Sequence, residues 1–193
     1  MFRYIIRTVA FIYIKIFNRL ECVNLKNIPR EGSLILYSNH ISNADPVILI
    51  GPVKRMAYFM AKQELFNNRL MAKFFLALGV FPVKRGSGDI SAIKNALAKL
   101  KTGAILCMFP EGTRKKEGKT SKILPGIAML AIRSRCPVLP AAIMGNFGFL
   151  KKMKIIYGTP IDLSQYYGKE LTNDDYIKIS EDLMKESQKL MEG

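Results

Sequence analysis

Short apolar runs alternate with amphipathic stretches along most of this chain. Most of the runs are bounded by Gly, Pro or charged residues, a pattern typical of β-strands that are covered on both faces of a sheet. The runs are residues 33–38, 56–60, 81–83, 104–109, 138–143 and 153–157. We expect each of them to form a strand.

Helical periodicity occupies the intervals, and several helix ends carry capping signals. Asp45 followed by Pro46 opens one helix, because Asp caps helix N-termini and proline is favoured at the first helical position. The other predicted helices are a segment capped by Asp89 and ended by Gly103, residues 122–134, and a last helix that Thr172 and Asp175 begin with a capping box. The alternation of strands and helices, with no internal repeat or linker, predicts a single α/β domain with a largely parallel central sheet flanked by helices.

The first twenty residues have an amphipathic pattern of their own. On a helix, their apolar side chains fill one arc of about 160°, and the basic side chains fall on the opposite arc, which Tyr4, Phe11 and Ile14 share. The basic residues are Arg3, Arg7, Lys15 and Arg19. A helix that is apolar on one side and basic on the other suits the bilayer interface, with the cations reaching anionic headgroups.

Two other interpretations of this segment are open. An ordinary amphipathic helix could dock on the core of its own domain. A membrane-spanning helix is disfavoured, because it would bury Arg7 and Lys15 near mid-depth at a cost of several kcal/mol. We expect a membrane-interface helix over residues 1–20, followed by the α/β domain over residues 21–193.

Charge and cysteine usage narrow the functional classes. The 193 residues carry 30 Lys plus Arg against 15 Asp plus Glu, a net charge of +15, which attracts anionic lipid, phosphate-bearing substrates, an acidic carrier protein or nucleic acid. Simple solubility is the plain alternative. Nucleic acid is disfavoured, because no aromatic-basic stacking pattern accompanies the charge. Three scattered cysteines argue against a disulfide framework or a thiolate zinc site, so a reducing compartment and no metal are expected.

The single histidine, His40, lies directly after an apolar run, where a strand-to-helix loop would place it at the carboxyl edge of the sheet. If Asp45 folds back onto the imidazole, it fixes the tautomer and leaves the other ring nitrogen able to accept a proton. This pair, with no protein nucleophile, suits direct attack by a substrate hydroxyl on an activated acyl group. The alternatives are a structural histidine and an aspartate whose role is capping alone.

Two further segments could bind an anion. In Phe-Pro-Glu-Gly-Thr-Arg, Gly112 permits close backbone approach, Thr113 and Arg114 offer donors to phosphate oxygens, and Glu111 could hold Arg114 or accept from a ligand hydroxyl. Near residue 85, a short strand delivers Lys84 and Arg85 to the same edge, where they could help to hold a phosphomonoester. Taken singly, each segment is equally compatible with a turn or a solvated basic cluster.

Together and in this order, the segments resemble the signature blocks of the glycerophosphate acyltransferase family, most closely the bacterial 1-acylglycerol-3-phosphate acyltransferases. The N-H-x-x-x-x-D block is matched by Asn39, His40 and Asp45, and the F-P-E-G-T-R block is matched without change by residues 109–114. Gly79 and Arg85 match the block between them, and an apolar segment with prolines, residues 136–143, resembles the last block.

The resemblance implies that His40 deprotonates an acceptor hydroxyl while Asp45 orients it. Phosphate and glycerol would be held by Arg85, Glu111, Gly112 and Arg114, with Thr113 in the same block. Lys84 departs from the family pattern, and its two interpretations are an added contact to the phosphate and a solvent-facing side chain. The implied reaction moves an acyl group from acyl-CoA or acyl carrier protein to the sn-2 hydroxyl of lysophosphatidic acid, on the cytoplasmic face of a bacterial membrane, with no cofactor. Glycerol 3-phosphate or another lysolipid as acceptor, and a non-catalytic lipid-binding protein of the same fold, are the alternatives.

Overall fold

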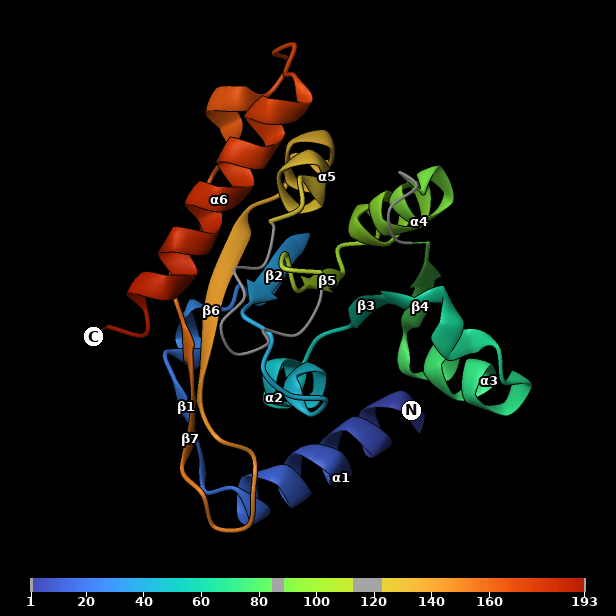
Figure 1. Cartoon of the computed structure of the whole chain (residues 1–193), viewed down its shortest axis with the longest axis vertical. Coiled ribbons are helices and arrows are strands. Elements are labelled where there is room, and N and C mark those ends of the chain that lie inside the picture. Colours follow the sequence, from blue (N-terminus) through green and yellow to red (C-terminus); the bar gives the residue numbers. More distant parts are fainter. Residues whose placement is uncertain (1, 85–88, 113–122, 193) are drawn as a thin grey trace.

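The protein folds around a seven-stranded sheet with the strand order β1-β7-β6-β2-β5-β3-β4 (Figure 1). The computed structural model describes residues 2–84, 89–112 and 123–192. The strands are β1 Leu20–Val23, β2 Leu34–Ser38, β3 Ala57–Lys62, β4 Val80–Val83, β5 Ile105–Met108, β6 Val138–Gly145 and β7 Met153–Tyr157. Within these strands the β6–β7 pairing is antiparallel and every other pairing is parallel, which confirms the largely parallel sheet.

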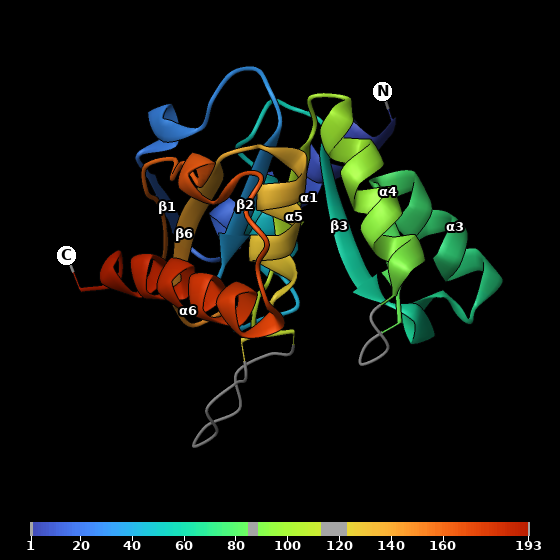
Figure 2. The same cartoon turned by 90° about the horizontal axis from the view of Figure 1, so that it is seen from above.

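Helices cover both faces of the sheet. They are α1 Phe2–Phe17, α2 Asp45–Ile50, α3 Arg69–Leu78, α4 Ile90–Lys101, α5 Gly126–Ser134 and α6 Asn173–Lys189, with short 3₁₀ turns at Leu25–Asn27, Gln63–Phe66 and Ser164–Tyr166. One core joins α1 and α2 to the sheet, and a second core joins α4, α5 and α6 to the opposite face (Figure 2). The α/β architecture with flanking helices is therefore as predicted.

Strand β2 lies at the centre of the sheet, and this position explains why its sequence is continuously apolar. Leu34 and Leu36 point into the core beneath α2, whereas Ile35 and Tyr37 point into the core beneath α4, α5 and α6. All five residues of the strand are buried. A strand covered on both faces needs apolar side chains at successive positions, so the run is continuous and does not alternate.

The observed elements differ from the prediction in a few places. Strand β1 and helix α3 were not predicted, and Asp45 is the first residue of α2, whose N-cap is Ala44. The predicted 122–134 helix begins at Gly126, directly after Pro125, and residue 122 lies outside the described part of the chain. The Asp89 cap and the capping box at the start of α6 are confirmed.

Helix α1 docks on the domain through its basic arc. Ile14 is buried, Phe11 packs against the same core, and Arg7 Nη1 donates to the carbonyl of Arg55 at 2.9 Å. Arg3 Nε donates to the carbonyl of Ala77 at 3.1 Å. The two N-terminal arginines, predicted to reach lipid headgroups, thus contact the domain, whereas Lys15 and Arg19 are exposed.

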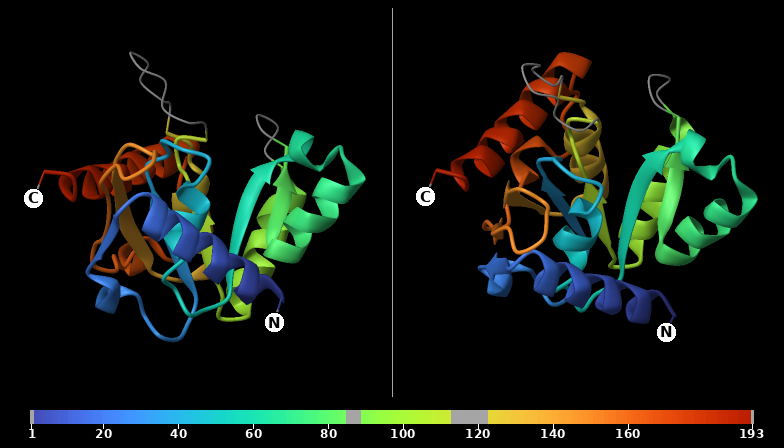
Figure 3. Two further views of the ribbon diagram at one scale, coloured as in Figure 1. Left: turned by 90° about the horizontal axis from the view of Figure 1, so that it is seen from below. Right: turned by 60° about the horizontal axis from the view of Figure 1, so that its bottom comes forward.

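Most of the apolar arc of α1 faces away from the domain. The side chains of Ile5, Val9, Ile12, Tyr13 and Ile16 are between 50% and 71% exposed. Across the described residues, no helix has both the length and the apolar character needed to cross a bilayer. The helix crosses the α2 face of the sheet from the β6–β7 side to the β3–β4 side (Figures 1 and 3).

Replacing Gly51 by Ala should weaken the docking of α1. Gly51 has ordinary right-handed helical angles, so Ala strains no backbone there, but a Cβ at this position would overlap the Phe11 ring. Overpacking of this kind costs about 1–3 kcal/mol. We expect a lower urea midpoint for Gly51→Ala. The matched control is Gly126→Ala, whose Cβ meets only Met108 Cε at 3.8 Å; equal midpoints for both variants would contradict the docking contact.

Candidate active site

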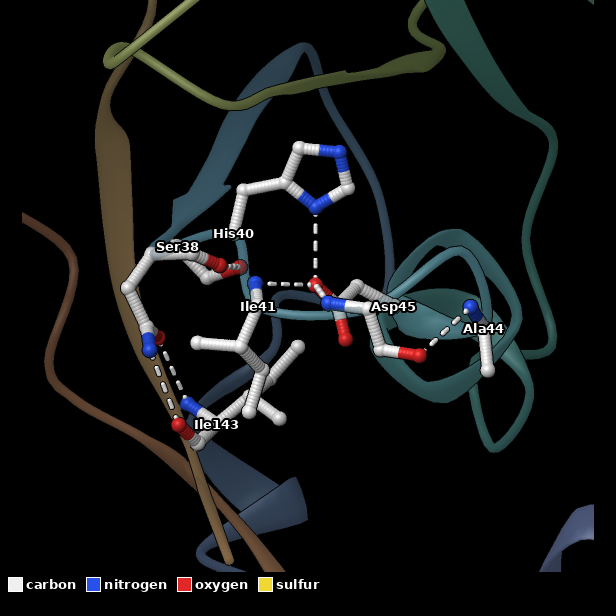
Figure 4. A network of polar contacts seen from close by, with 8 residues as sticks. Ser38, His40, Ile41, Ala44, Asp45 and Ile143 are labelled. Carbon is white, nitrogen blue, oxygen red and sulfur yellow. Dashed lines mark hydrogen bonds and ion pairs between the residues drawn. The ribbon is translucent and has the colours of Figure 1, made fainter. Parts of the chain in front are cut away.

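His40 and Asp45 form a hydrogen-bonded pair at the carboxyl end of β2 (Figure 4). His40 Nδ1 lies 2.7 Å from Asp45 Oδ2, and Asp45 is fully buried. The same oxygen accepts the backbone N–H groups of Ile41 at 2.6 Å and Ser42 at 2.7 Å. The carboxylate therefore holds both the imidazole and the loop that carries it, which is the folded-back arrangement that the family resemblance implied.

One face of the His40 ring packs against an aromatic side chain, and its second nitrogen, Nε2, is left without a hydrogen bond among the described residues. Phe109 stacks on the imidazole with centroids 4.1 Å apart and planes 16° apart, and Phe59 stacks on Phe109 at 6.3 Å. The His40 side chain is 18% exposed. Within the described residues Nε2 has no hydrogen-bond partner, and it points away from Asp45 (Figure 4). With Nδ1–H donating to the carboxylate, Nε2 is able to accept a proton.

Asn39 connects the loop that carries His40 to the neighbouring strand. Its amide Nδ2 donates to the carbonyl of Ile143 at 2.9 Å, and its Oδ1 accepts the Ile143 N–H at 2.8 Å. Main-chain pairing of β2 with β6 ends at Ser38 and Ala141, so this side chain continues the connection by one more step. No role was predicted for Asn39 from the sequence, and the available signal was its position directly before His40 in the family block.

The segment after β5 lies beside His40 because β5 is the neighbour of β2. Phe109 and Gly112 close a turn, in which the Gly112 N–H donates to the Phe109 carbonyl at 2.9 Å. Gly112 has φ of 66°, a conformation that favours glycine, and a Cβ there would also require the Leu124 side chain to shift, because it would lie 2.8 Å from Leu124 Cδ1. Glu111 and Gly112 are half-buried, while Thr113 and Arg114 lie outside the described residues.

Lys84 follows the edge strand β4, which is three places from β2 in the sheet. Three strand spacings amount to about 14 Å. The Lys84 N–H donates to Asp89 Oδ2 at 2.9 Å, and this bond, with those from Ser91 and Ala92, lowers the pKa of Asp89 to about 2. Arg85 is outside the described residues. The structure thus brings together His40, Asp45 and the turn at Glu111, whereas the cluster of phosphate-binding cations stays a prediction.

The chain's three thiols are poor candidates for a nucleophile. Burial raises the pKa of Cys107, which lies in β5 beneath the site, and burial also raises the pKa of Cys22 and of Cys136. A thiol becomes a strong nucleophile as its thiolate, so these environments disfavour a covalent intermediate on cysteine. The geometry suits a base that activates a hydroxyl supplied by a bound molecule.

A small apolar cavity approaches the site from the α1 side. Its volume is about 90 Å³, and it is enclosed by α1, α2, β3, β4 and the end of α3. Pro46, which follows Asp45, and Phe59, which stacks on Phe109, are both part of its wall. Arg3 and Arg7 line it where α1 covers it. Two stacked aromatic rings, those of Phe59 and Phe109, therefore connect the cavity wall to the imidazole.

Most of the chain is similar in sequence to known proteins. The model of the acyltransferase family matches residues 19–144. The 1-acyl-sn-glycerol-3-phosphate acyltransferase of Bacillus subtilis (strain 168) is 31% identical over 153 residues, covering 76% of this chain and 76% of that protein. A probable 1-acyl-sn-glycerol-3-phosphate acyltransferase of Mycoplasma pneumoniae is 27% identical, covering 93% of this chain and 77% of the relative.

A solved structure shares the fold. The crystal structure of the 1-acyl-sn-glycerophosphate (LPA) acyltransferase PlsC from Thermotoga maritima superimposes with a TM-score of 0.72 at 24% sequence identity. The match covers 99% of this chain and 78% of that chain. The likeness supports the architecture of the sheet and helices described above.

Proposed function

This chain belongs to the acyltransferase family, and on that premise we propose that it moves a fatty acyl group from an acyl thioester to the sn-2 hydroxyl of lysophosphatidic acid, giving phosphatidic acid for phospholipid synthesis. The names of its relatives support this acceptor. The structural observation that carries the proposal is the 2.7 Å contact between His40 Nδ1 and the buried Asp45, which leaves Nε2 available.

In the proposed reaction, His40 Nε2 takes the proton of the acceptor hydroxyl as its oxygen attacks the thioester carbonyl. The tetrahedral intermediate then collapses, the carbon–sulfur bond breaks, and the proton on His40 passes to the leaving thiolate. Asp45 stabilises the imidazolium that exists between these two transfers and keeps the ring in the productive orientation. No protein nucleophile takes part.

The proposed acceptor site uses the cations predicted from the sequence. Lys84, Arg85 and Arg114 would pair with the phosphate, and Glu111, Gly112 and Thr113 would contact the glycerol or shape the turn around it. Arginine suits this role, because its planar fork binds two phosphate oxygens at once. The net charge of +15 adds a general attraction for phosphorylated substrates.

The acyl chain of the donor is proposed to enter the apolar cavity between α1 and α2. At about 90 Å³ the cavity is smaller than a usual ligand pocket, so a long chain would have to displace α1 or extend beyond it. The proposed donor is acyl-CoA or acyl carrier protein, since each presents the chain as a thioester on a phosphorylated arm. No further cofactor enters the proposed reaction.

We further propose that the protein acts as a peripheral enzyme on the cytoplasmic face of a bacterial membrane. The apolar arc of α1 points outward, so it can lie at the interface without moving off the domain. Lys15 and Arg19 are exposed beside it, where they can pair with anionic headgroups. In this proposal residues 1–20 bring residues 21–193 to an acceptor that is already in the bilayer.

The purified full chain should convert lysophosphatidic acid to phosphatidic acid and leave lysophosphatidylcholine nearly unchanged. The reason is the phosphomonoester, which carries more charge than a diester and pairs better with the predicted cations. The measurement is product mass from a panel of lysophosphatidic acid, glycerol 3-phosphate and lysophosphatidylcholine, each offered with acyl-CoA and with acyl carrier protein. Turnover of either other acceptor in place of lysophosphatidic acid would overturn the proposed substrate.

A further inference from the structure

Residues 146–152, here called the β6–β7 loop, expose an unusual set of side chains. The loop reads Asn-Phe-Gly-Phe-Leu-Lys-Lys. Phe147, Phe149 and Leu150 are 42%, 70% and 47% exposed, and they are followed by two exposed lysines. Single exposed apolar residues are ordinary on a protein surface, but adjacent large ones indicate a contact surface.

The loop is fixed to the C-terminal end of α1. The Leu150 N–H donates to the Phe17 carbonyl at 2.6 Å, and the fully buried Asn18 donates from Nδ2 to the Gly148 carbonyl at 2.9 Å. Figures 1 and 3 show the loop beside this end of the helix. The exposed phenylalanines are thus presented from a loop that hydrogen bonds hold in place at Gly148 and at Leu150.

Ring contacts join the loop to the outward arc of α1. The Phe17 ring centroid lies 5.7 Å from that of Phe147 and 5.5 Å from that of Phe149, and Tyr13 stacks on Phe17 at 5.4 Å. Tyr13 belongs to the exposed apolar arc of the helix. The loop and the arc therefore form one continuous apolar surface, which we call the α1–loop surface.

Cations surround this end of the α1–loop surface. Lys15, Arg19, Lys151 and Lys152 are all exposed, and Glu21 is the nearby acidic residue. Arg19, Lys152 and Lys154 also line a hollow of about 410 Å³, together with Glu21 and the backbone where β6 ends and β7 begins. This end of the α1–loop surface is therefore positively charged, and an anionic surface would be attracted to it.

We infer that the β6–β7 loop is a second membrane-contacting element that binds an anionic bilayer together with α1. Phe147, Phe149 and Leu150 enter the interface, where aromatic side chains are favoured, and Lys151 and Lys152 contact the headgroups. The inference extends the proposed membrane docking of α1. With two attached elements, the helix cannot roll about its axis on the membrane, so the orientation of the catalytic edge is fixed.

An acidic carrier protein is the other partner that this charge could attract. It would account for the lysines, but three exposed apolar side chains continuous with the outward arc of α1 are better matched by lipid. The loop also lies at the end of β6, which runs four residues beyond Ala141, the partner of the last residue of β2. Four strand residues span about 13 Å, so a membrane touching the loop would lie within reach of the catalytic edge.

The test is sedimentation of the full chain with vesicles of phosphatidylcholine alone or with one quarter phosphatidylglycerol. The variant Phe147→Ser/Phe149→Ser should bind the mixed vesicles at least about tenfold more weakly. Lys151→Gln/Lys152→Gln should lose about 10- to 30-fold on mixed vesicles and little on phosphatidylcholine alone. All side chains changed are exposed, so the melting temperatures should stay close to that of the parent chain.

Matched controls separate this loop from general surface changes. Leu25→Ser removes an apolar side chain of similar exposure, 39%, at the far end of β1. Lys169→Gln/Lys178→Gln removes the same charge at exposed positions near and on α6. Vesicle binding by both controls should equal that of the parent chain. If the loop variants bind like the controls, or if the lysine variant loses only its affinity for acyl carrier protein, the inference is overturned.

The inference and the proposed function can fail separately. Turnover of a short-chain lysophosphatidic acid dispersed in detergent needs no vesicle, so Phe147→Ser/Phe149→Ser should retain it. If the parent chain shows no acyl transfer but the loop variants still lose vesicle binding, the membrane element stands and the proposed reaction falls. The reverse result, acyl transfer with vesicle binding untouched by the loop changes, removes the inference alone.

Discussion

His40→Ala should lower the rate of acyl transfer by about 10³- to 10⁴-fold, because it removes the proposed general base. The measurement is initial velocity with lysophosphatidic acid and an acyl thioester, at saturating and at low acceptor. We expect the loss in kcat, since the imidazole acts on the hydroxyl in the transition state and adds little to binding of the phosphate.

Controls for this variant follow from the surroundings of the ring. His40 is partly exposed and stacks on Phe109, so its removal should cost only about 1 kcal/mol of stability. Vesicle binding should be unchanged, because the α1–loop surface does not include His40. Added imidazole should restore part of the rate by occupying the space above Phe109. Undiminished turnover of His40→Ala would remove the proposed mechanism.

Asp45→Asn should lower kcat by about 10²- to 10³-fold while the protein stays folded. The amide oxygen can still accept the N–H groups of Ile41 and Ser42, which now bond Asp45 Oδ2 at 2.6 and 2.7 Å. What the amide lacks is the negative charge that stabilises the imidazolium after His40 has taken the proton. The rate therefore falls although most of the local hydrogen bonds can persist.

Asp45→Ala provides the contrast that separates orientation from catalysis. It leaves the same two N–H groups without their acceptor, which costs about 1–3 kcal/mol for each buried group. We expect this variant to lose both activity and stability in urea unfolding, whereas Asp45→Asn loses mainly activity. If both variants lose activity only in proportion to stability, the role of Asp45 is structural, as a cap and loop support.

The arrangement of the fold could be predicted largely because its strands are buried on both faces. The continuous apolar run of β2 and its neighbours, broken by capped helices, indicated a parallel sheet. Strand β1 was missed because Leu20 fitted the periodicity of the preceding helix. The helix ends before Arg19, whose φ of 41° lies in a region that an arginine does not signal in a sequence.

Both ends of helix α3 could have been predicted from the sequence. Asn68 accepts two backbone N–H groups as the N-cap, and Gly79 follows the last turn with φ of 87°. The segment has no buried residue, so its apolar side chains do not identify a core face in the usual way. Caps were informative here, although periodicity alone was not.

The docking of α1 shows what local pattern leaves out. The apolar and basic arcs of the helix could be predicted from the sequence. Which arc contacts the domain could not, because it depends on the space that Gly51 leaves for Phe11 and on the backbone carbonyls of residues 55 and 77. In the site, likewise, the pairing of His40 with Asp45 is local, whereas that of Asn39 with Ile143 joins residues 104 apart through the order of the strands. Such contacts are set by tertiary structure.

The antiparallel direction of β7 determines which connection in the fold can change without disturbing the other elements. A parallel β6–β7 connection would have needed a crossover that returns the chain to the opposite edge of the sheet. Because β7 runs antiparallel to β6, a short connection remains at the edge that carries His40. In the proposed membrane docking, insertions or substitutions at this reversal would change how the protein contacts lipids of different composition, and no helix or central strand would have to be rebuilt.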